Sequence, residues 1–388
     1  MKNWISLLKR EFRLFSSNSV IMAIFLGAPL AYGLLFGAVY KKGKVDNLPI
    51  LVIDLDNTPM SHNLIDMLDD NEVVTPNVVY NQNNIRHLII ETEYSSIITI
   101  PEHFEADIIQ KRHPEVQVEV NTANILTANY ASKAIQIVLG SLNAGIEIEG
   151  LKKQGVPAIT ASSQYESFNV SYVKFFNASA NYMEFLWPGM IGVIVQQVFM
   201  LALALSFARE FEERTFFTEF MPKAKNVVNA MFLKTIPFWL MGIVILALIR
   251  GMFTLFRIPF DINPVAAVAL ITALVVSVSF LGVLFSVAIP SQLKATEVLM
   301  VIATPSFVVS GFTWPLSQMP GYVVAFAKTI PLTHFLEGLR KLMLYHANLT
   351  DLMPQIKAMM ILAAVFAGLS FILLEIKIRR QNKRVPLQ

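Results

Sequence analysis

Six stretches of the chain contain no Asp, Glu, Lys or Arg and are rich in apolar side chains. A helix needs roughly 20 mostly apolar residues to cross about 30 Å of hydrocarbon. The pattern therefore predicts six transmembrane helices. The third is the shortest, because Lys234 and Arg250 bracket it, and prolines predict bends or ends in the fourth and fifth. The ranges are 19–40, 187–208, 235–249, 262–293, 298–327 and 358–374.

Residues 1–18 have an apolar face at helical spacing and basic residues elsewhere on the wheel, which predicts an amphipathic helix in the membrane interface. A plain basic flank of the first span is the alternative. The following stretch, 19–40, is too long for a signal-peptide core and has no small-residue cleavage site, so we expect an uncleaved anchor. The apolar face is Trp4, Leu8, Phe12 and Phe15, and the basic residues are Lys9, Arg10 and Arg13.

The polar segment 41–180 reads as a folded α/β domain inserted between the first two spans. Thr58 and Pro59 are typical of a helix start, which predicts a helix to about Asp70. Alternating or apolar runs predict strands at 49–54, 72–80, 95–100 and 116–120, and helices at 83–92, from 101, and at 123–153.

Basic residues near the span ends favour a cytoplasmic N-terminus. Six spans then place both termini in the cytoplasm, the tail 375–388 included, and put the inserted domain outside. Lys41, Lys42 and Lys44 go against this rule. The predicted fold class is an α-helical polytopic membrane protein with six transmembrane helices and an inserted extracytoplasmic α/β domain.

Composition narrows the function classes. The chain is 54% hydrophobic and 15% charged, whereas soluble domains carry about 25% charged residues. Its mean hydropathy of +0.54 argues against a soluble enzyme and against disorder. A net charge of +3 is too small for a nucleic-acid binder of this size. Because there is no cysteine, disulfides, thiolate metal sites and cysteine nucleophiles are excluded.

One run matches a catalytic motif. Asp54-Leu55-Asp56-Asn57-Thr58 follows an apolar strand, as the nucleophile loop of haloacid-dehalogenase-type phosphatases does. A strand end followed by a helix cap explains the same residues, and the later motifs of that fold are missing. Residues 37–44 depart from a phosphate-binding loop, and the six histidines have no metal-ligand spacing. We therefore expect no catalytic residue, metal or cofactor site in this chain.

The predicted cytoplasmic loop 209–230 opens with charges packed against aromatic residues. In a charge-poor chain this pattern predicts a docking element for a cytoplasmic partner, with charges that steer and aromatics that anchor. An ordinary solvated loop is the alternative. The candidate coupling residues are Arg209, Glu210, Glu212, Glu213, Arg214 and Thr215.

Polar residues inside the spans are the next candidates. Amides at the middle of a membrane cost free energy unless they bond across helices or face a wet path. Gln196 and Gln197 in the second span, with Thr304 and Ser306 in the fifth, are candidates for a translocation path or a dimer interface.

The segment 312–350 is too apolar for an exposed loop, and prolines divide it into short pieces. We expect helical pieces that re-enter the outer membrane face. Its candidate residues are Pro331, His334, Glu337 and Arg340, of which Glu337 and Arg340 have the i,i+3 spacing of an ion pair.

Taken in order, these features resemble an ABC-2-type permease, the membrane subunit of an ATP-binding-cassette exporter. The run VIDLDNTPMS is similar to the start of that family's large outer domain, and PLTHFLEGLR to its outer helix before the last span. REFEERT resembles its coupling-helix pattern, except that Arg214 stands where the family usually has Gly.

The resemblance implies half of a transporter. Two permeases, identical or different, would pair in the cell (inner) membrane. Separate ATPase subunits using ATP and Mg would bind their cytoplasmic faces. Exported small amphiphilic drug-like molecules or lipids are the expected cargo, and a periplasmic adaptor, an outer-membrane channel and membrane lipid are further expected partners. The alternatives are an ATP-independent polytopic transporter or sensor, which would carry charges deep in several spans, and a membrane-anchored phosphatase.

Overall fold

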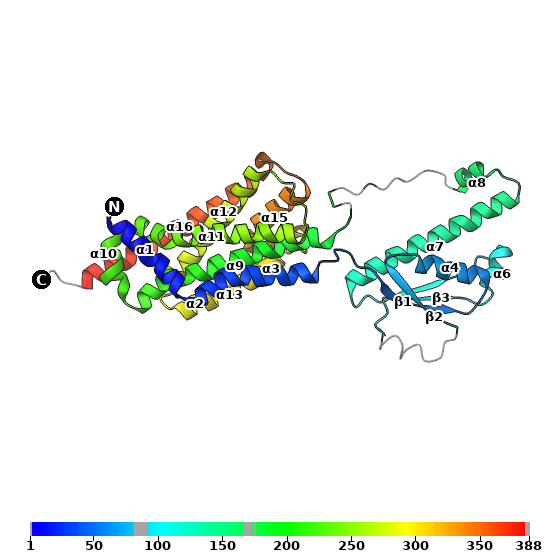
Figure 1. Cartoon of the computed structure of the whole chain (residues 1–388), viewed down its shortest axis with the longest axis horizontal. Coiled ribbons are helices and arrows are strands. Elements are labelled where there is room, and N and C mark those ends of the chain that lie inside the picture. Colours follow the sequence, from blue (N-terminus) through cyan, green and yellow to red (C-terminus); the bar gives the residue numbers. More distant parts are fainter. Residues whose placement is uncertain (1, 81–91, 166–172, 174–175, 178, 385–388) are drawn as a thin grey trace. The chain divides into compact units, whose positions relative to one another are not determined.

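The computed structural model describes residues 2–80, 92–165, 173, 176–177 and 179–384. The chain divides into two compact units, one formed by Met1–Gly43 with Lys174–Gln388 and the other by Lys44–Val173 (Figure 1). The first unit is helical, and the second combines a sheet with helices.

Within the described residues, five helices are long and apolar enough to cross a membrane. All five carry a proline inside the helix or at its first turn, which membrane helices tolerate. The five are α9 (Tyr182–Glu212), α11 (Val227–Leu255), α12 (Pro264–Ala288), α13 (Gln292–Val309) and α16 (Leu349–Arg384).

The first predicted span, 19–40, is a series of shorter pieces rather than one α-helix. These are α2 (Ser19–Met22), a π-helical turn η1 (Ala23–Gly27) and α3 (Ala28–Val39). The π turn lies just before Pro29, which has no N–H to continue the α-helical ladder. The indole Nε1 of Trp187 in α9 donates to the carbonyl of Gly33 at 3.0 Å, so α3 packs closely on α9.

The fifth predicted span, 298–327, is wrong in its C-terminal half. Helix α13 begins earlier, at Gln292, and ends at Val309. Gly311 then has a φ of +84°, a left-handed conformation that glycine adopts without strain. The chain continues as η3 (Leu316–Gln318), α14 (Gly321–Ala327) and α15 (Pro331–Leu344).

Helix α12 packs against both α9 and α16. Its Ser286 hydroxyl accepts hydrogen bonds from the backbone N–H groups of Phe207 and Ala208, both at 2.8 Å. Gly282 brings the backbones together, since a Cβ there would lie 2.7 Å from the carbonyl oxygen of Met200. Small residues at such crossings let membrane helices pack by close contact.

The Lys44–Val173 unit is built on a four-stranded sheet with the order β2-β1-β3-β4. β1 (Leu48–Asp54) pairs in parallel with β2 (Val74–Val79) and β3 (Ser96–Ile100), and β4 (Gln117–Val120) is antiparallel to β3. Alternate residues of β1, among them Ile50 and Val52, are buried with Leu64 and Ile135 from the helices.

Three helices of this unit are in the predicted order, and the structure adds α8 (Ala158–Tyr165), which was not predicted. The three are α4 (Pro59–Asp69), α6 (Phe104–Ile109) and α7 (Ile125–Lys153), and α4 and α7 lie on one side of the sheet (Figure 1). The predicted strands and the helices at 59–70, from 101 and at 123–153 are confirmed. The predicted helix at 83–92 falls almost wholly outside the described residues.

The Gly282 crossing makes a first prediction. Gly282→Ala forces a methyl group against a backbone oxygen and should lower the free energy of unfolding in mild detergent by about 1–3 kcal/mol. Gly251→Ala in α11 is the matched control, since its Cβ would meet nothing within 4 Å. Equal thermal unfolding of the two variants would show that the α9–α12 contact is not close-packed.

Candidate functional site

Four charged side chains from three helices meet at one end of the helical unit. Glu210, near the end of α9, lies 2.7 Å from Lys234 Nζ of α11 and 2.7 Å from Arg10 Nη1 of α1 (Lys2–Ser17). Glu11 of α1 closes the group, 2.9 Å from both Lys234 and Arg10. We call these residues, two acids and two bases, the charge cluster.

The charge cluster is removed from solvent. The side chains of Glu210 and Lys234 are each 2% exposed, Glu11 is 9% exposed, and only Arg10 reaches the surface. Burial of one such ion without a partner costs several kcal/mol. Formal neutrality and short hydrogen bonds are therefore what make the arrangement tolerable.

Two further groups contact the charged atoms of the cluster besides the ion pairs. The Thr215 hydroxyl donates to Glu210 Oε2 at 2.5 Å, and Lys234 Nζ lies 4.5 Å from the ring centre of Phe220. Burial alone would lower the pKa of Arg10, but the hydrogen bond and negative charge of Glu210 raise it above its ordinary value. The guanidinium therefore stays charged at every physiological pH.

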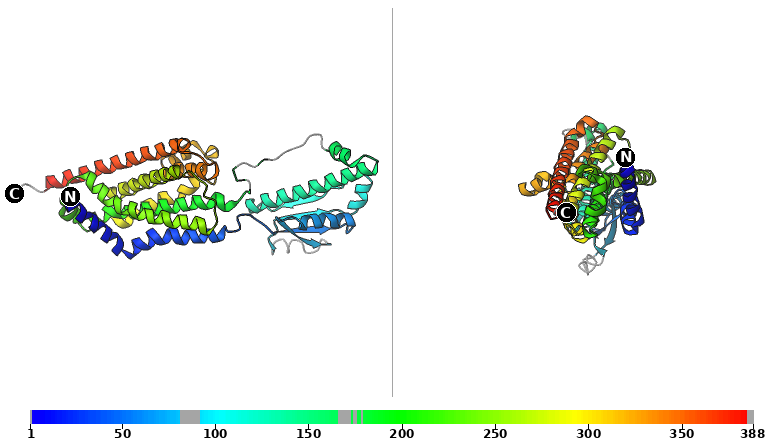
Figure 2. Two further views of the ribbon diagram at one scale, coloured as in Figure 1. Left: turned by 45° about the horizontal axis from the view of Figure 1, so that its top comes forward. Right: turned by 90° about the vertical axis from the view of Figure 1, so that its left-hand side faces the viewer.

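Helix α1 reaches the cluster because one of its faces is buried. Leu7, Glu11 and Phe15 pack against the unit, while Trp4 is 37% exposed. The Phe15 ring meets Phe25 and Phe238 edge-on, with centroids 5.3 and 5.2 Å apart. In Figure 2 this helix, dark blue, runs obliquely to α3. The buried face is thus offset from the predicted apolar face, which included Leu8 and Phe12.

The other predicted coupling residues lie on the surface. Arg209 and Glu213 form an exposed pair at 2.8 Å, and Gln292 of α13 donates to Glu212 at 2.6 Å. Arg214 has a φ of 60° directly after the helix end, the left-handed position where glycine is favoured. This geometry gives a physical reason for a glycine at that position in a coupling sequence.

The aromatic residues of this loop face inward rather than outward. Phe216 and Phe220 are buried in η2 (Phe216–Phe220), which leads into α10 (Met221–Ala224). Phe211 is half-buried and packs on Phe216 at 4.8 Å. These rings anchor the loop to its own helices. The charged side chains of Glu212, Glu213 and Arg214 remain exposed, as do those of Glu219, Lys223 and Lys225 further along.

The structure joins two of the four polar residues predicted inside the spans. Gln196 Nε2 donates to Ser306 Oγ at 3.1 Å, and both side chains are buried. Gln197 is half-buried. Thr304 lies on the exposed side of α13 and donates to the carbonyl of Met300 at 2.8 Å. The Gln196 contact fixes α9 to α13.

In the segment 312–350, the predicted Glu337–Arg340 ion pair is wrong. Arg340 donates to the carbonyl of Phe312 at 2.7 Å and lies 5.0 Å from its ring centre. Glu337 instead pairs with Lys341 at 3.0 Å and accepts from Gln355 at 2.8 Å. The carbonyl groups freed where α13 ends compete successfully for the guanidinium.

The two remaining candidate residues of the segment 312–350 lie at the start of α15. Pro331 occupies its first turn, where a missing N–H costs nothing, and is buried. His334 Nε2 makes a hydrogen bond with the carbonyl of Lys328 at 2.9 Å. Both contacts shape the turn before the helix.

The phosphatase-like run is a turn in this fold. Asp54 is buried and accepts from the N–H groups of Asp56 and Asn57 at 3.1 and 3.0 Å, and from the Ser61 hydroxyl at 2.8 Å. Thr58 and Ser61 form a capping box on α4. Both carboxylate oxygens of Asp54 thus hold local structure together.

Sequence reasoning missed three members of the charge cluster, namely Arg10, Glu11 and Lys234. Lys234 carried the best signal, since it lies within a long apolar helix and a buried lysine needs an acidic partner. The ion pairs of α1 with α9 and with α11 link residues 200 and 223 positions apart, and no local pattern specifies them.

Together, the apolar helices and the neutralised charge cluster define a polytopic membrane protein. The chain belongs to the ABC-2 family of transporter proteins, whose family model matches residues 19–372. It is thus an ABC transporter permease by family.

Its relatives carry consistent names. It is 23% identical over 347 residues to ABC transporter G family member 20 of Dictyostelium discoideum, covering 87% of this chain but only 45% of that protein. It is 20% identical to the inner membrane transport permease YhhJ of Escherichia coli, with 85% of each chain covered. It is 24% identical over 200 residues to the "Probable multidrug ABC transporter permease YbhS" of the same species, covering 51% of this chain and 52% of that one.

The charge cluster predicts an asymmetric response to mutation. Glu210→Gln leaves a buried excess of positive charge and should reduce the free energy of unfolding in mild detergent by about 3–5 kcal/mol. Adding Lys234→Met restores neutrality and should recover part of that loss. The matched control, Glu213→Gln, breaks an exposed pair and should cost at most about 1 kcal/mol. A similar loss of unfolding free energy in Glu210→Gln and Glu213→Gln would show that the charge cluster stabilises the chain no more than an exposed ion pair does.

The left-handed conformation at residue 214 makes a separate prediction. Arg214→Gly should stabilise the chain by about 1 kcal/mol, because the left-handed region costs other residues roughly 1–2 kcal/mol. Arg214→Ala removes the same side chain without relieving the backbone and should give no such gain. Thermal unfolding that ranks the two variants equally would contradict the assigned helix end.

Proposed function

We propose that the chain is the permease subunit of an ABC exporter that moves small amphiphilic molecules or lipids out of the cytoplasm or the inner membrane. Membership in the ABC-2 family supports a permease whose ATPase partners are separate chains. The similarity to YbhS, which is named a probable multidrug permease, supports a drug-like cargo. In this proposal ATP and Mg are used by the partner, and this chain contributes no catalytic residue, cofactor site or metal site.

The proposed topology has six spans, with α3 as the first, and both termini in the cytoplasm of a cell (inner) membrane. The segment 1–18 then lies in the cytoplasmic interface, and the domain of 41–180 lies outside, where an adaptor and an outer-membrane channel are candidate partners. The segment 312–350 re-enters the outer face, and 375–388 is a cytoplasmic tail. A second permease chain pairs with the first to complete the path.

The observation that carries the proposal is the charge cluster. An ATPase that binds the exposed charges of Glu212, Glu213 and Arg214 pushes on the end of α9. Glu210 lies on the same helix and is bonded to α11 through Lys234 and to α1 through Arg10. A displacement of this loop therefore moves α1, α9 and α11 together.

The Gln196–Ser306 hydrogen bond lies within the proposed path and would transmit this movement from α9 to α13. The exposed face of α13 carries Thr304, Met300 and Val301, which suits packing against a second permease or a mobile substrate. An ATP-independent transporter is the alternative, and it would leave the loop charges without a partner to bind.

Affinity purification in mild detergent from the native host tests this proposal. The expected result is a co-purifying ATP-binding-cassette ATPase with measurable ATP hydrolysis. Charge reversal of the loop (Glu212→Lys, Glu213→Lys, Arg214→Glu) should remove that ATPase, because the docking charges then repel it.

A matched control makes the same change in net charge on the other unit. Glu147→Lys, Glu149→Lys and Lys152→Glu alter three exposed residues of α7 and should leave the ATPase bound. Purification of the native chain without any ATPase, while a control ABC complex stays intact, would contradict the proposal. Loss of the ATPase in both reversed variants would contradict the assignment of the docking surface.

A further inference from the structure

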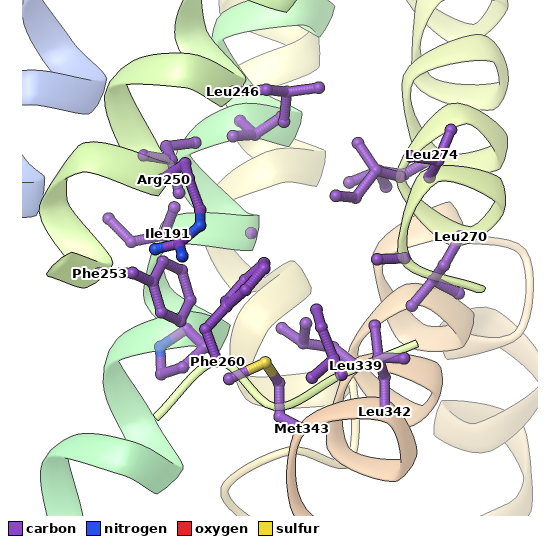
Figure 3. A pocket seen from close by; sticks show the side chains of 18 of the residues that line it. Ile191, Leu246, Arg250, Phe253, Phe260, Leu270, Leu274, Leu339, Leu342 and Met343 are labelled. Carbon is purple, nitrogen blue, oxygen red and sulfur yellow. The ribbon is translucent and has the colours of Figure 1, made fainter. Parts of the chain in front are cut away.

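The helical unit contains an apolar pocket of about 280 Å³. Its walls come from α9, α11, α12 and α15 and from the loop that joins α11 to α12 (Figure 3). Ile191 and Phe253 line one side, and Leu270 and Leu274 face them across the space. The volume is just below the range of roughly 300–1,000 Å³ that holds drug-sized ligands. The pocket therefore suits a narrow apolar chain better than a bulky molecule.

Every lining residue is apolar except Arg250. Figure 3 shows its guanidinium at the pocket wall beside Phe253 and Phe260. The guanidinium carbon lies 4.5 Å from the ring centre of Phe260, and Nη1 donates to the Thr254 hydroxyl at 2.9 Å. A guanidinium has five N–H donors in a fork that matches phosphate and carboxylate oxygens.

This cation has no acidic partner in the part of the chain that the structure describes, since no carboxylate lies within 4.0 Å of it. Its side chain is exposed. A cation in a membrane helix is costly and normally pairs with an opposite charge or reaches the interface. Phe260 and Thr254 instead hold the guanidinium at the pocket, and within the described residues Thr254 is the one hydrogen-bond acceptor it meets, so other donors can bind an anion.

The depth of Arg250 fits a lipid phosphate. It lies five residues before Leu255, the last residue of α11, which is about 7.5 Å along the helix axis. Pro264 begins α12 at the same end of the unit. A phospholipid whose phosphate meets Arg250 would direct its acyl chain inward, along the walls of the pocket.

We propose that this pocket is a binding site for one membrane phospholipid, with an acyl chain against Ile191, Phe253, Leu270 and Leu274 and the headgroup phosphate on Arg250. A free phosphate ion would leave the apolar walls empty, and an uncharged hydrocarbon would leave the guanidinium unpaired. Among the described residues that line the pocket, none belongs to α13. The site shares helix α9 with the proposed path but includes none of the path residues Gln196, Gln197, Thr304 and Ser306, and the inference does not depend on ATP-driven export.

Photolabelling of the full chain in phosphatidylcholine vesicles tests the site without ATP or an ATPase. The two probes are a phosphatidic acid and a diacylglycerol with the same diazirine-bearing acyl chain. The phosphatidic acid probe should label peptides of α9, α11 and α12 that line the pocket, and the diacylglycerol should label them about tenfold less, since one charge-assisted contact is lost. Equal labelling by both probes would overturn the headgroup assignment.

Two pairs of variants sharpen the test. Arg250→Gln should reduce pocket labelling by about tenfold, whereas Arg257→Gln removes an exposed cation from the neighbouring loop and should not change it. Val268→Trp fills the pocket from its exposed edge and should abolish labelling there. Val265→Trp, one turn earlier on α12 and equally exposed, should have no effect.

All four variants alter exposed side chains, so elution as one folded species in size-exclusion chromatography is expected. Labelling that spreads evenly over every exposed helix, or that survives both Arg250→Gln and Val268→Trp, would show only the bulk lipid that surrounds any membrane protein and would overturn the proposal. An export defect or a missing ATPase would leave these labelling results unchanged.

Discussion

The bonds between Glu210 and its two cationic partners are the constraint on which one end of the helical unit depends, the end where α1, α9 and α11 meet. An acid that is 2% exposed can remain ionised there only while Lys234 and Arg10 stay within hydrogen-bond distance. That requirement fixes where α1 and α11 lie against α9. It also explains why the loop after α9 turns back, since Thr215 must reach the same carboxylate and Phe220 must cover Lys234.

A transporter needs rigid contacts at some helix pairs and adjustable contacts at others. The α9–α12 crossing is of the rigid kind, because Gly282 lies against a backbone oxygen that has no rotamer to change. Among the described residues, the α9–α13 pair carries two side-chain hydrogen bonds, from Gln196 to Ser306 and from Gln292 to Glu212. Each of them can break and re-form at the cost of a single hydrogen bond. In this arrangement α13 is the helix best able to shift against the rest, whereas α12 moves with α9.

The sequence was sufficient for elements with a strong local signal. Alternation and caps predicted the strands of the 44–173 unit and α4, because Thr58, Pro59 and Ser61 specify the start of that helix by local bonds. Hydropathy located the long apolar helices but not their ends: a lack of charge continues past Val309, while the backbone turns at Gly311. The charge cluster and the partners of Arg340 could not be predicted from the sequence, since both depend on groups far apart in sequence.

The two cations of α11 show how the same residue type can have opposite roles. Lys234 and Arg250 lie sixteen residues apart, about 24 Å along the axis, which approaches the thickness of about 30 Å of hydrocarbon. Lys234 is enclosed and neutralised by acids of its own chain. Arg250 is exposed, oriented by a ring and a hydroxyl, and without a carboxylate in the described structure. A helix built this way is fastened to protein at one end and is open to an anion of the membrane at the other.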